Sequence, residues 1–426
     1  MSATPGSDTD GSQLDLTTIA IMPGDKVEVA KHGLRVLAIL SALMGFASIS
    51  TDLYLPALPS MARALRASPG MMELTISGFL VGFSLGQLLW GPIGDRYGRR
   101  MPIVAGLVLF IIGSVGCALS DSAWMMVSWR VVQAVGACAS VVLARAIVRD
   151  LYEGARAAQM LSTLITVMAI APLLGPILGG QILIFSSWPT IFWLLGVMGA
   201  LTLAAVLTLP ETLAPERRNH QPLGRAMLHY LTLVRRPQLL GYAGAVGFYY
   251  GGLYAYLAGT PFAYITYHHL RPQLYGLVFG TGIIGIMATN VINARIVARF
   301  GGTRLMRMGT AVAAVSALVI GLDAWTGWGG LAGLALPLFV FIGIAGFIVA
   351  NAIAGALMQS PERAGTVSAL VGAIQYGSGI ISSGLVGAFA DGTPWPMGGV
   401  ILLCGLGSLA CAWLLVPAPG KIRATV

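Results

Sequence analysis

The sequence predicts an all-α membrane protein with about twelve transmembrane helices, and three observations support this fold class. The chain has 426 residues, of which 56% are apolar and only 10% charged, whereas soluble domains carry roughly 25% charged residues. The mean hydropathy is +0.81. The apolar runs last about twenty residues, as a spanning helix requires, and they lack the period of two expected for a membrane β-barrel.

The apolar windows fall into two groups of six. We expect spans near 34–58, 72–94, 101–120, 124–148, 157–185, 188–209, 239–265, 273–298, 304–323, 331–358, 364–390 and 395–416. A polar interruption separates the groups. We therefore expect a disordered cytoplasmic tail at 1–30, an N-terminal six-helix bundle at 31–209, a cytoplasmic linker at 210–238, a C-terminal six-helix bundle at 239–416 and a cytoplasmic tail at 417–426.

The distribution of basic residues predicts the orientation. If the N-terminus is cytoplasmic, 21 of the 25 Lys and Arg fall on the inner side, three on the outer side, and Arg130 lies within a span. Because Lys and Arg favour cytoplasmic loops, we expect both termini inside. The same asymmetry explains the net charge of +9 without a nucleic-acid partner.

The two groups of spans resemble each other weakly. The loop after the second span reads GPIGDRYGRR over Gly91–Arg100, and the corresponding loop of the second half, Asn293–Gly301, is a weaker copy with basic residues and a glycine. Repeated halves with a binding site between them are typical of transporters. We therefore expect two pseudo-symmetric six-helix halves.

Two charged residues lie well inside predicted spans, Asp52 in the first and Arg130 in the fourth. A charge at mid-bilayer costs roughly 2.5–3.5 kcal/mol on insertion scales. Each lies six residues from the outer end of its span, so at 1.5 Å per residue both are about 9 Å deep and meet if the spans are neighbours. The pair is either a static ion pair or a protonation switch, in which Asp52 binds the proton and Arg130 tunes it.

Three segments of the first half carry motifs. Besides the Gly91–Arg100 loop, span 4 contains RVVQAVG over 130–136, and span 5 contains APLLGPILGG over 171–180. The first two resemble the G-x-x-x-D-R-x-G-R-R signature and the R-x-x-Q-G-x-G motif of the major facilitator superfamily, although span 4 has one residue inserted between Gln and Gly. The third resembles the G-P-x-x-G-G motif associated with the antiporters of that superfamily. Setting of the topology by loop charges and ordinary packing of small residues are the alternative interpretations.

Together with DLYLPALP over 52–59 and the RDLY of Arg149–Tyr152, these motifs resemble the bicyclomycin- and chloramphenicol-resistance (Bcr/CflA) group of drug:proton antiporters. The resemblance implies the major facilitator fold, a bacterial inner membrane, and Asp52 with Arg130 as the coupling pair. It also implies gating charges in the loops, and we include Asp95, Arg96, Arg99, Arg100, Arg149 and Asp150. The antiporter motif falls on Pro172, Gly175, Pro176, Gly179 and Gly180.

Candidate substrate-binding residues are intramembrane aromatic and amide side chains, which suit flat, moderately polar molecules. They are Tyr54, Gln133, Tyr249, Tyr250, Tyr256, Asn351 and Gln375. Packing in the core, for the tyrosines, and bridging between helices, for the amides, are the alternatives. Since the spans offer no second buried carboxylate for a cation, neutral or zwitterionic substrates are favoured over strongly cationic ones, with Asp52 itself as the alternative partner of a cation.

The favoured function is a proton-coupled exporter of small drug-like molecules of the amphenicol or bicyclomycin type. An importer or facilitator of a nutrient or amino acid is the alternative, because no motif encodes direction. The five histidines lie in loops or at span edges without partner carboxylates, and the four cysteines lie in apolar runs, so we expect no enzyme, no metal and no cofactor other than the coupling proton. We expect the chain to work as a monomer.

Overall fold

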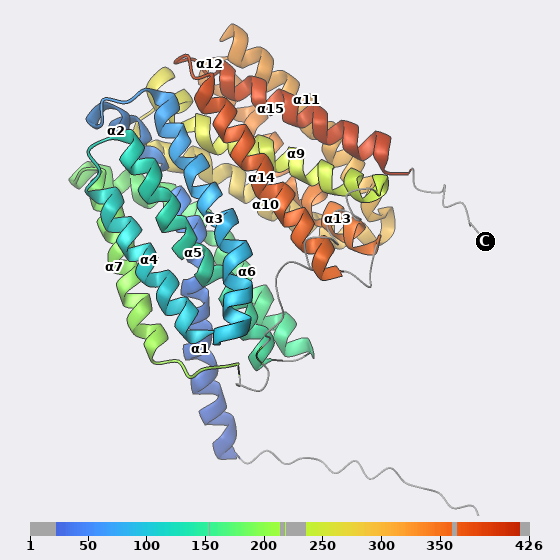
Figure 1. Ribbon diagram of the computed structural model, residues 1–426. Coiled ribbons are helices and arrows are strands. Elements are labelled where there is room, and N and C mark those ends of the chain that lie inside the picture. Colours follow the sequence, from blue (N-terminus) through green and yellow to red (C-terminus); the bar gives the residue numbers. More distant parts are fainter. Residues whose placement is uncertain (1–22, 153, 214–217, 219–235, 360–363, 418–426) are drawn as a thin grey trace, which may run out of the picture.

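The computed structural model describes residues 23–152, 154–213, 218, 236–359 and 364–417, and within them the chain forms helices and connecting turns (Figure 1). Ten helices are long and apolar enough to cross a membrane, and α6 adds the shorter apolar stretch Ile170–Phe185. With α9, a Tyr-rich helix of 24 residues, these segments correspond one by one to the predicted spans. The all-α membrane fold is confirmed.

Each half contributes six spanning segments. The N-terminal half contains α1 (Pro23–Asp52) with η1 (Leu55–Ala57) and α2 (Leu58–Ala64), α3 (Pro69–Tyr97), α4 (Arg100–Ala118), α5 (Ala123–Leu151), α6 (Gly154–Phe185) and α7 (Pro189–Leu207). The C-terminal half contains α9 (Pro237–Thr260) with η3 (Pro261–Tyr267), α10 (Pro272–Phe300), α11 (Gly302–Thr326), α12 (Gly330–Gly343) with α13 (Ala345–Met358), α14 (Ala364–Ala388) and α15 (Trp395–Ala410) with η5 (Cys411–Leu415).

The expected domain boundaries differ from the helices at one end. Helix α1 begins at Pro23, so residues 23–30, which we expected in a disordered tail, are helical. Most of the expected linker 210–238, and the tail 418–426, lie outside the described residues. The division into two halves of six spans remains the organisation that the described helices follow.

The repeat of the two halves is clearer in the structure than in the sequence. Helices α3 and α10 each have 29 residues, begin at a proline and end before a glycine in the left-handed region, Gly98 (φ 93°) or Gly301 (φ 80°). Residues with a Cβ rarely adopt such angles. The glycine shared by the two loops therefore marks the same turn in each half.

The two halves touch at one end of the molecule and separate toward the other. Near the start of α3, a Cβ on Gly70 would overlap the Gly387 carbonyl group of α14, and Ser77 shares a 2.8 Å hydrogen bond with Ser383. Further along α14 toward its N-terminus, a Cβ on Gly372 or Gly377 would meet no atom within 4 Å. We call the end with Gly70 and Gly387 the closed end; in Figure 1 the halves diverge away from it.

The loop between α3 and α4 lies at the opposite end and is fixed by Glu211, which follows α7. Glu211 accepts hydrogen bonds from the backbone N–H groups of Arg99 (2.7 Å) and Arg100 (3.1 Å) at the start of α4. Its carboxylate also fills the space beside Gly98, where a Cβ would lie 2.5 Å from Oε2. Partial burial raises the pKa of Glu211, but the backbone hydrogen bonds outweigh it and hold the pKa below its ordinary value.

We expect Glu211→Ala to lower the stability of the folded chain by about 1 kcal/mol, because the first N–H groups of α4 lose their acceptor. The contribution of the carboxylate should be present above the pKa of an unfolded glutamate, about 4.3. It should disappear as pH falls through the lower pKa of the folded state. Thermal unfolding of the purified chain at several pH values measures both effects. An equal loss at neutral and strongly acidic pH would contradict this role.

Candidate functional site

A cavity of about 340 Å³ lies between the halves, within the size range of small-molecule sites. Its walls come from α1, α3 and α6 of one half and from α9, α10, α12 and α14 of the other. Among the described lining residues Asp52 is the only charged side chain, and most of the wall is aromatic or aliphatic. The aromatic members are Phe79, Phe83, Tyr250, Tyr254, Tyr256, Phe279 and Tyr376.

Asp52 stands where helix α1 ends. The chain continues through the short η1, whose proline Pro56 cannot donate the hydrogen bond that a continuing α-helix requires. Asp52 is 4% exposed yet lines the cavity. The prolines that follow Asp52 in the sequence predict that the helix ends here. The structure confirms that the carboxylate lies beside irregular backbone rather than in the middle of a helix.

Helix α6 presses against this break through the glycines of the antiporter motif. A Cβ on Gly175 would lie 2.9 Å from the Cβ of Asp52, and one on Gly179 would lie inside contact distance of the Leu53 carbonyl oxygen. Gly180 faces Pro272 of α10 in the other half, 2.7 Å from its carbonyl oxygen by the same measure. The prolines of the motif divide similarly: Pro172 lines the cavity, and the backbone of Pro176 lies against α10 at Gly276. The motif therefore packs α6 on both halves.

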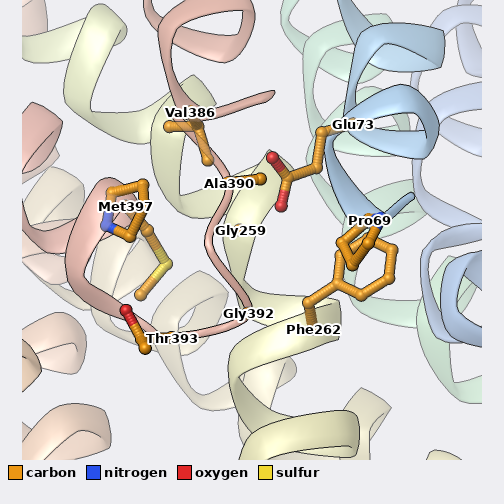
Figure 2. Close-up of a pocket in the computed structure, with 10 residues that line it drawn as sticks. Pro69, Glu73, Gly259, Phe262, Val386, Ala390, Gly392, Thr393 and Met397 are labelled. Carbon is orange, nitrogen blue, oxygen red and sulfur yellow. The ribbon is translucent and has the colours of Figure 1, made fainter. Parts of the chain in front are cut away.

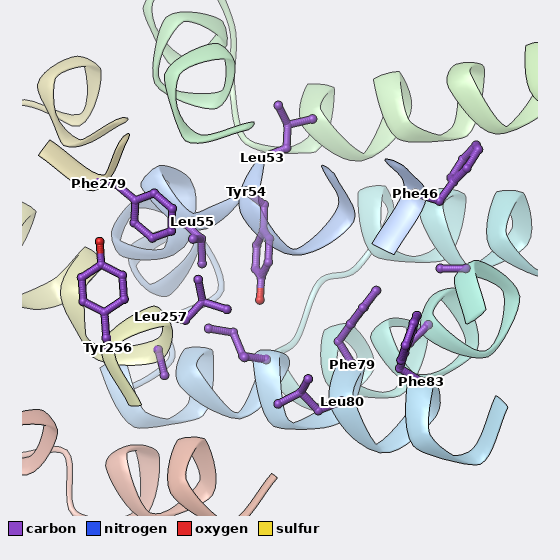
Figure 3. Close-up of a cluster of buried hydrophobic side chains, with 14 of the residues drawn as sticks. Phe46, Leu53, Tyr54, Leu55, Phe79, Leu80, Phe83, Tyr256, Leu257 and Phe279 are labelled. Atoms are coloured by element: carbon purple, nitrogen blue, oxygen red, sulfur yellow. The ribbon is translucent and has the colours of Figure 1, made fainter. Parts of the chain in front are cut away.

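Arg130 is completely buried in α5, beside the end of α1. Its Nη1 donates to the Ser50 carbonyl oxygen (2.9 Å) and to Gln133 Oε1 (2.5 Å). Its guanidinium carbon lies 4.3 Å from the ring centroids of both Tyr54 and Phe79, a distance at which aromatic faces attract a cation. Nε and Nη2 have no hydrogen-bond partner. Figure 3 shows the two rings, from the turn after α1 and from α3, in the buried cluster.

The structure brings Asp52 and Arg130 to the same region without joining them. Helices α1 and α5 pack together, and Arg130 bonds the carbonyl two residues before Asp52. The ion pairs of the described residues are Arg99–Asp95 and Arg99–Asp150, and neither involves this pair. The static ion pair that the sequence left open is therefore not formed in this conformation.

The predicted aromatic residues separate by helix face. Tyr250 and Tyr256 line the cavity. Tyr249 donates its hydroxyl to the carbonyl oxygens of Phe341 and Ile342, both at 2.9 Å, and is fully buried in the C-terminal half. Tyr54 is also fully buried and shares a 3.0 Å hydrogen bond with Thr75. In this conformation Tyr249 and Tyr54 are core residues, as the alternative interpretation allows.

The three predicted amides lie outside the cavity lining. Gln133 accepts from Arg130 and donates to Ser114 (2.8 Å), which orients the guanidinium. Asn351 donates to Asn293 Oδ1 (2.7 Å) and so bridges α13 and α10. Gln375 precedes the lining residue Tyr376 by one position on α14. For Gln133 and Asn351 the contacts favour the bridging role.

Sequence reasoning missed part of the cavity wall. Four aromatic residues of the wall were not predicted, because the seventh span alone stands out in the sequence as rich in aromatic residues; they are Phe79, Phe83, Phe279 and Tyr376. A usable signal existed on α9, where Tyr250, Leu253, Tyr254 and Leu257 recur at helical spacing and all face the cavity. No such pattern distinguishes the single aromatic residue Tyr376 on α14.

The predicted gating charges gather at the end opposite the closed end, within the N-terminal half. Arg99 donates to Asp95 (2.6 Å) and to Asp150 (2.8 Å), and so links the ends of α3 and α5. Arg100 donates to the Leu207 carbonyl oxygen (2.5 Å), and Arg96 lies 5.6 Å from the Tyr97 ring centroid. The side chain of Arg149 lies outside the described set. The gating role itself stays a prediction.

Comparison with known proteins gives consistent results. The family model described as Major Facilitator Superfamily matches residues 40–383. The chain is similar to the uncharacterized MFS-type transporter YdgK of Bacillus subtilis, with 34% identity covering 89% of this chain and 95% of the relative. It is also similar to the bicyclomycin resistance protein homolog of Haemophilus influenzae, with 32% identity covering 85% and 90%.

Two further likenesses extend this picture. The chloramphenicol resistance protein of Pseudomonas aeruginosa is 29% identical over 86% of each chain. Among solved structures, a partially occluded inward-open conformation of the xylose transporter XylE from E. coli superimposes with a TM-score of 0.67. The match covers 90% of this chain and 99% of that one at 15% identity, which supports the fold alone.

The packing of α6 on the Asp52 turn yields a prediction. Gly179→Ala places a methyl group against the Leu53 carbonyl, so α6 must move away from η1. We expect a stability loss of about 1–3 kcal/mol and impaired transport. Thermal unfolding tests the first and transport assays the second. Gly372→Ala is the matched control, since it meets open space and should be neutral or slightly stabilising. Equal unfolding temperatures for both variants would contradict the packing argument.

Proposed function

The chain belongs to the Major Facilitator Superfamily, and from this premise we propose that it exports small drug-like molecules of the amphenicol and bicyclomycin type in exchange for protons. It is a multi-pass inner-membrane transporter and not an enzyme. Relatives named for bicyclomycin and chloramphenicol resistance support export of drugs. The observation that carries the proposal is the cavity between the halves, with Asp52 as the charged residue of its lining.

The position of Asp52 supports proton coupling. A carboxylate at a helix break, lining a cavity between two halves, changes its exposure to water when the halves move. Burial favours the protonated form, and hydration or a nearby cation favours the ionised form. Asp52 thus takes up a proton when the cavity faces outside and releases it when the cavity faces inside. The membrane potential adds roughly 2.3 kcal/mol per charge per 100 mV to this drive.

Arg130 tunes Asp52 and does not carry protons, because a guanidinium stays charged in proteins. Two of its nitrogens, Nε and Nη2, have no hydrogen-bond partner, so Arg130 can donate to a further acceptor. A small relative movement of α1 and α5 changes the distance between this cation and the Asp52 carboxylate. The charge on Arg130 therefore helps Asp52 to release its proton in one conformation more than in the other.

In this proposal the substrate binds in the cavity, between the aromatic rings of its walls. Tyr256 and Phe279 are stacked with centroids 5.3 Å apart, and Phe83 contacts Tyr376 across the two halves at 5.2 Å. Such a wall suits flat molecules of moderate polarity, and tyrosine hydroxyls add hydrogen bonds. With a single carboxylate in the lining, we propose neutral or zwitterionic substrates.

The orientation completes the proposal. With both termini in the cytoplasm, as the basic loops indicate, the closed end faces outside and the cavity opens inward. The charges around Arg99 then lie at the cytoplasmic end of the N-terminal half. We propose that they contact the C-terminal half when the cavity turns outward, and so close the inner side.

Expression in a pump-deficient bacterium tests the proposal. We expect resistance to amphenicols or bicyclomycin, and we expect Asp52→Asn to abolish it, because an amide mimics the protonated acid and cannot release a proton. In inverted vesicles the same variant should lose uptake driven by a pH gradient while it is inserted at normal levels. Sensitisation of the cells would instead favour an importer, and full gradient-driven uptake by Asp52→Asn would reject the coupling role.

The tuning role of Arg130 has its own test. We expect Arg130→Ala to shift the pH dependence of substrate binding to the purified chain, because Asp52 loses its nearby cation. Arg130→Lys keeps the charge but not the planar group that lies between Tyr54 and Phe79. It should therefore retain more of the wild-type profile than Arg130→Ala. Identical pH profiles for wild type and Arg130→Ala would show that Arg130 only holds the helices together.

A further inference from the structure

A second buried carboxylate, Glu73, lies outside the central cavity at the closed end. It belongs to the second turn of α3, is 3% exposed, and its Oε2 has no hydrogen-bond partner. The carboxylate points from the N-terminal half into a separate small cavity walled mainly by the C-terminal half (Figure 2). Neither the transport cycle proposed above nor the motifs account for it.

The surroundings of Glu73 do not suit a negative charge. The lining residues that face it include Phe262 of η3, Val386 of α14 and Met397 of α15, and among the ten described lining residues Glu73 is the only ionisable one. The cavity has a volume of about 20 Å³, room for roughly one water molecule. A carboxylate without a cation or a hydration shell is costly to bury, so the group binds a proton instead.

Other charged and titratable groups near this end do not neutralise Glu73. The neighbouring helices and loops carry ten such groups: Arg63, Arg66, Asp121, Tyr264, Tyr267, His268, His269, Arg271, Asp323 and Asp391. None lines the Glu73 cavity. Asp391 is exposed and accepts hydrogen bonds from Thr393 of its own loop. In the described chain no ion pair reaches Glu73.

The same contact that buries Glu73 closes this end of the molecule. A Cβ on Gly387 of α14 would lie 2.8 Å from the Gly70 carbonyl oxygen and 3.5 Å from the Cβ of Glu73. One turn further along α3, Ser77 bonds Ser383. Separation of the halves here exposes Glu73 to water, and their approach removes that water.

We propose that Glu73 is a second proton-binding site, at the contact between the two halves, and that its protonation holds the closed end shut. The carboxylate takes one proton from the solvent on this side as the end closes and returns it to the same side as the end opens. Acid on this side therefore favours closure, and alkali favours opening. The inference rests on the alternating access of the proposed function but not on the role of Asp52.

Hydrogen exchange of the full-length chain in lipid nanodiscs tests this site. Exchange of backbone amides in 386–399 is compared between wild type and Glu73→Gln at matched pH, which cancels the intrinsic pH dependence. Near pH 4, where even a water-exposed glutamate is largely protonated, we expect rates within about two-fold of each other. Near pH 8.5 we expect several-fold faster exchange in wild type, because only its carboxylate ionises and opens the end. Equal rates at both pH values would overturn the proposal.

Two further variants keep the result interpretable. Glu73→Met, which needs no proton, should behave as Glu73→Gln and replaces it if that variant does not fold. Asp391→Asn, a matched change of a carboxylate at the same end, should keep the wild-type response, and loss of the response there would also overturn the assignment to Glu73. Asp52→Asn separates the two proposals. If this variant loses transport but keeps the pH response of hydrogen exchange, both proposals are supported. If the pH response depends on Asp52 alone, the role of Glu73 is overturned.

Discussion

The break of helix α1 at Asp52 is the constraint on which the site depends. The helix ends there because Pro56 prevents its continuation, and the irregular turn that follows fits only against a surface without side chains. Gly175 and Gly179 of α6 provide that surface. An ordinary α6 with larger residues would displace the turn and move the carboxylate away from the cavity. The antiporter motif thus acts here through packing, by holding an acid at irregular backbone in the wall of a cavity.

The two halves share a similar backbone arrangement but carry different functional side chains. Gly98 and Gly301 end equivalent helices with a positive φ, yet Asp52, Arg130 and Glu73 all belong to the N-terminal half, while α9 supplies a row of cavity tyrosines. Asp52 thus lies on one wall of the cavity and the tyrosines lie on the other, while phenylalanine rings line both. A molecule bound between the walls therefore depends on both the protonation state of Asp52 and the position of the opposite half.

The sequence predicts the spans, their grouping into halves and the isolated buried charges, because hydropathy and the cost of charge in lipid act on each helix separately. It does not predict which face of a helix meets which neighbour. Tyr249 and Tyr250 are adjacent, yet one bonds carbonyl oxygens in the C-terminal core and the other lines the cavity. Glu73 lies near a helix end, where sequence reasoning assigns water, and only the contact with α14 buries it. Features made by contact between the halves require the three-dimensional structure.

Arg130 is kept apart from Asp52 and Glu73 in this conformation, and that separation has a consequence for the transport cycle. Arg130 is held by a backbone carbonyl, an amide and two aromatic faces, none of which bears a charge. Direct pairing with Asp52 would lower the free energy of one conformational state, since a desolvated ion pair is hard to separate. The neutral partners position the cation without forming such a pair. An exchanger must leave each state readily, so a positioned but unpaired arginine suits it better than a closed ion pair.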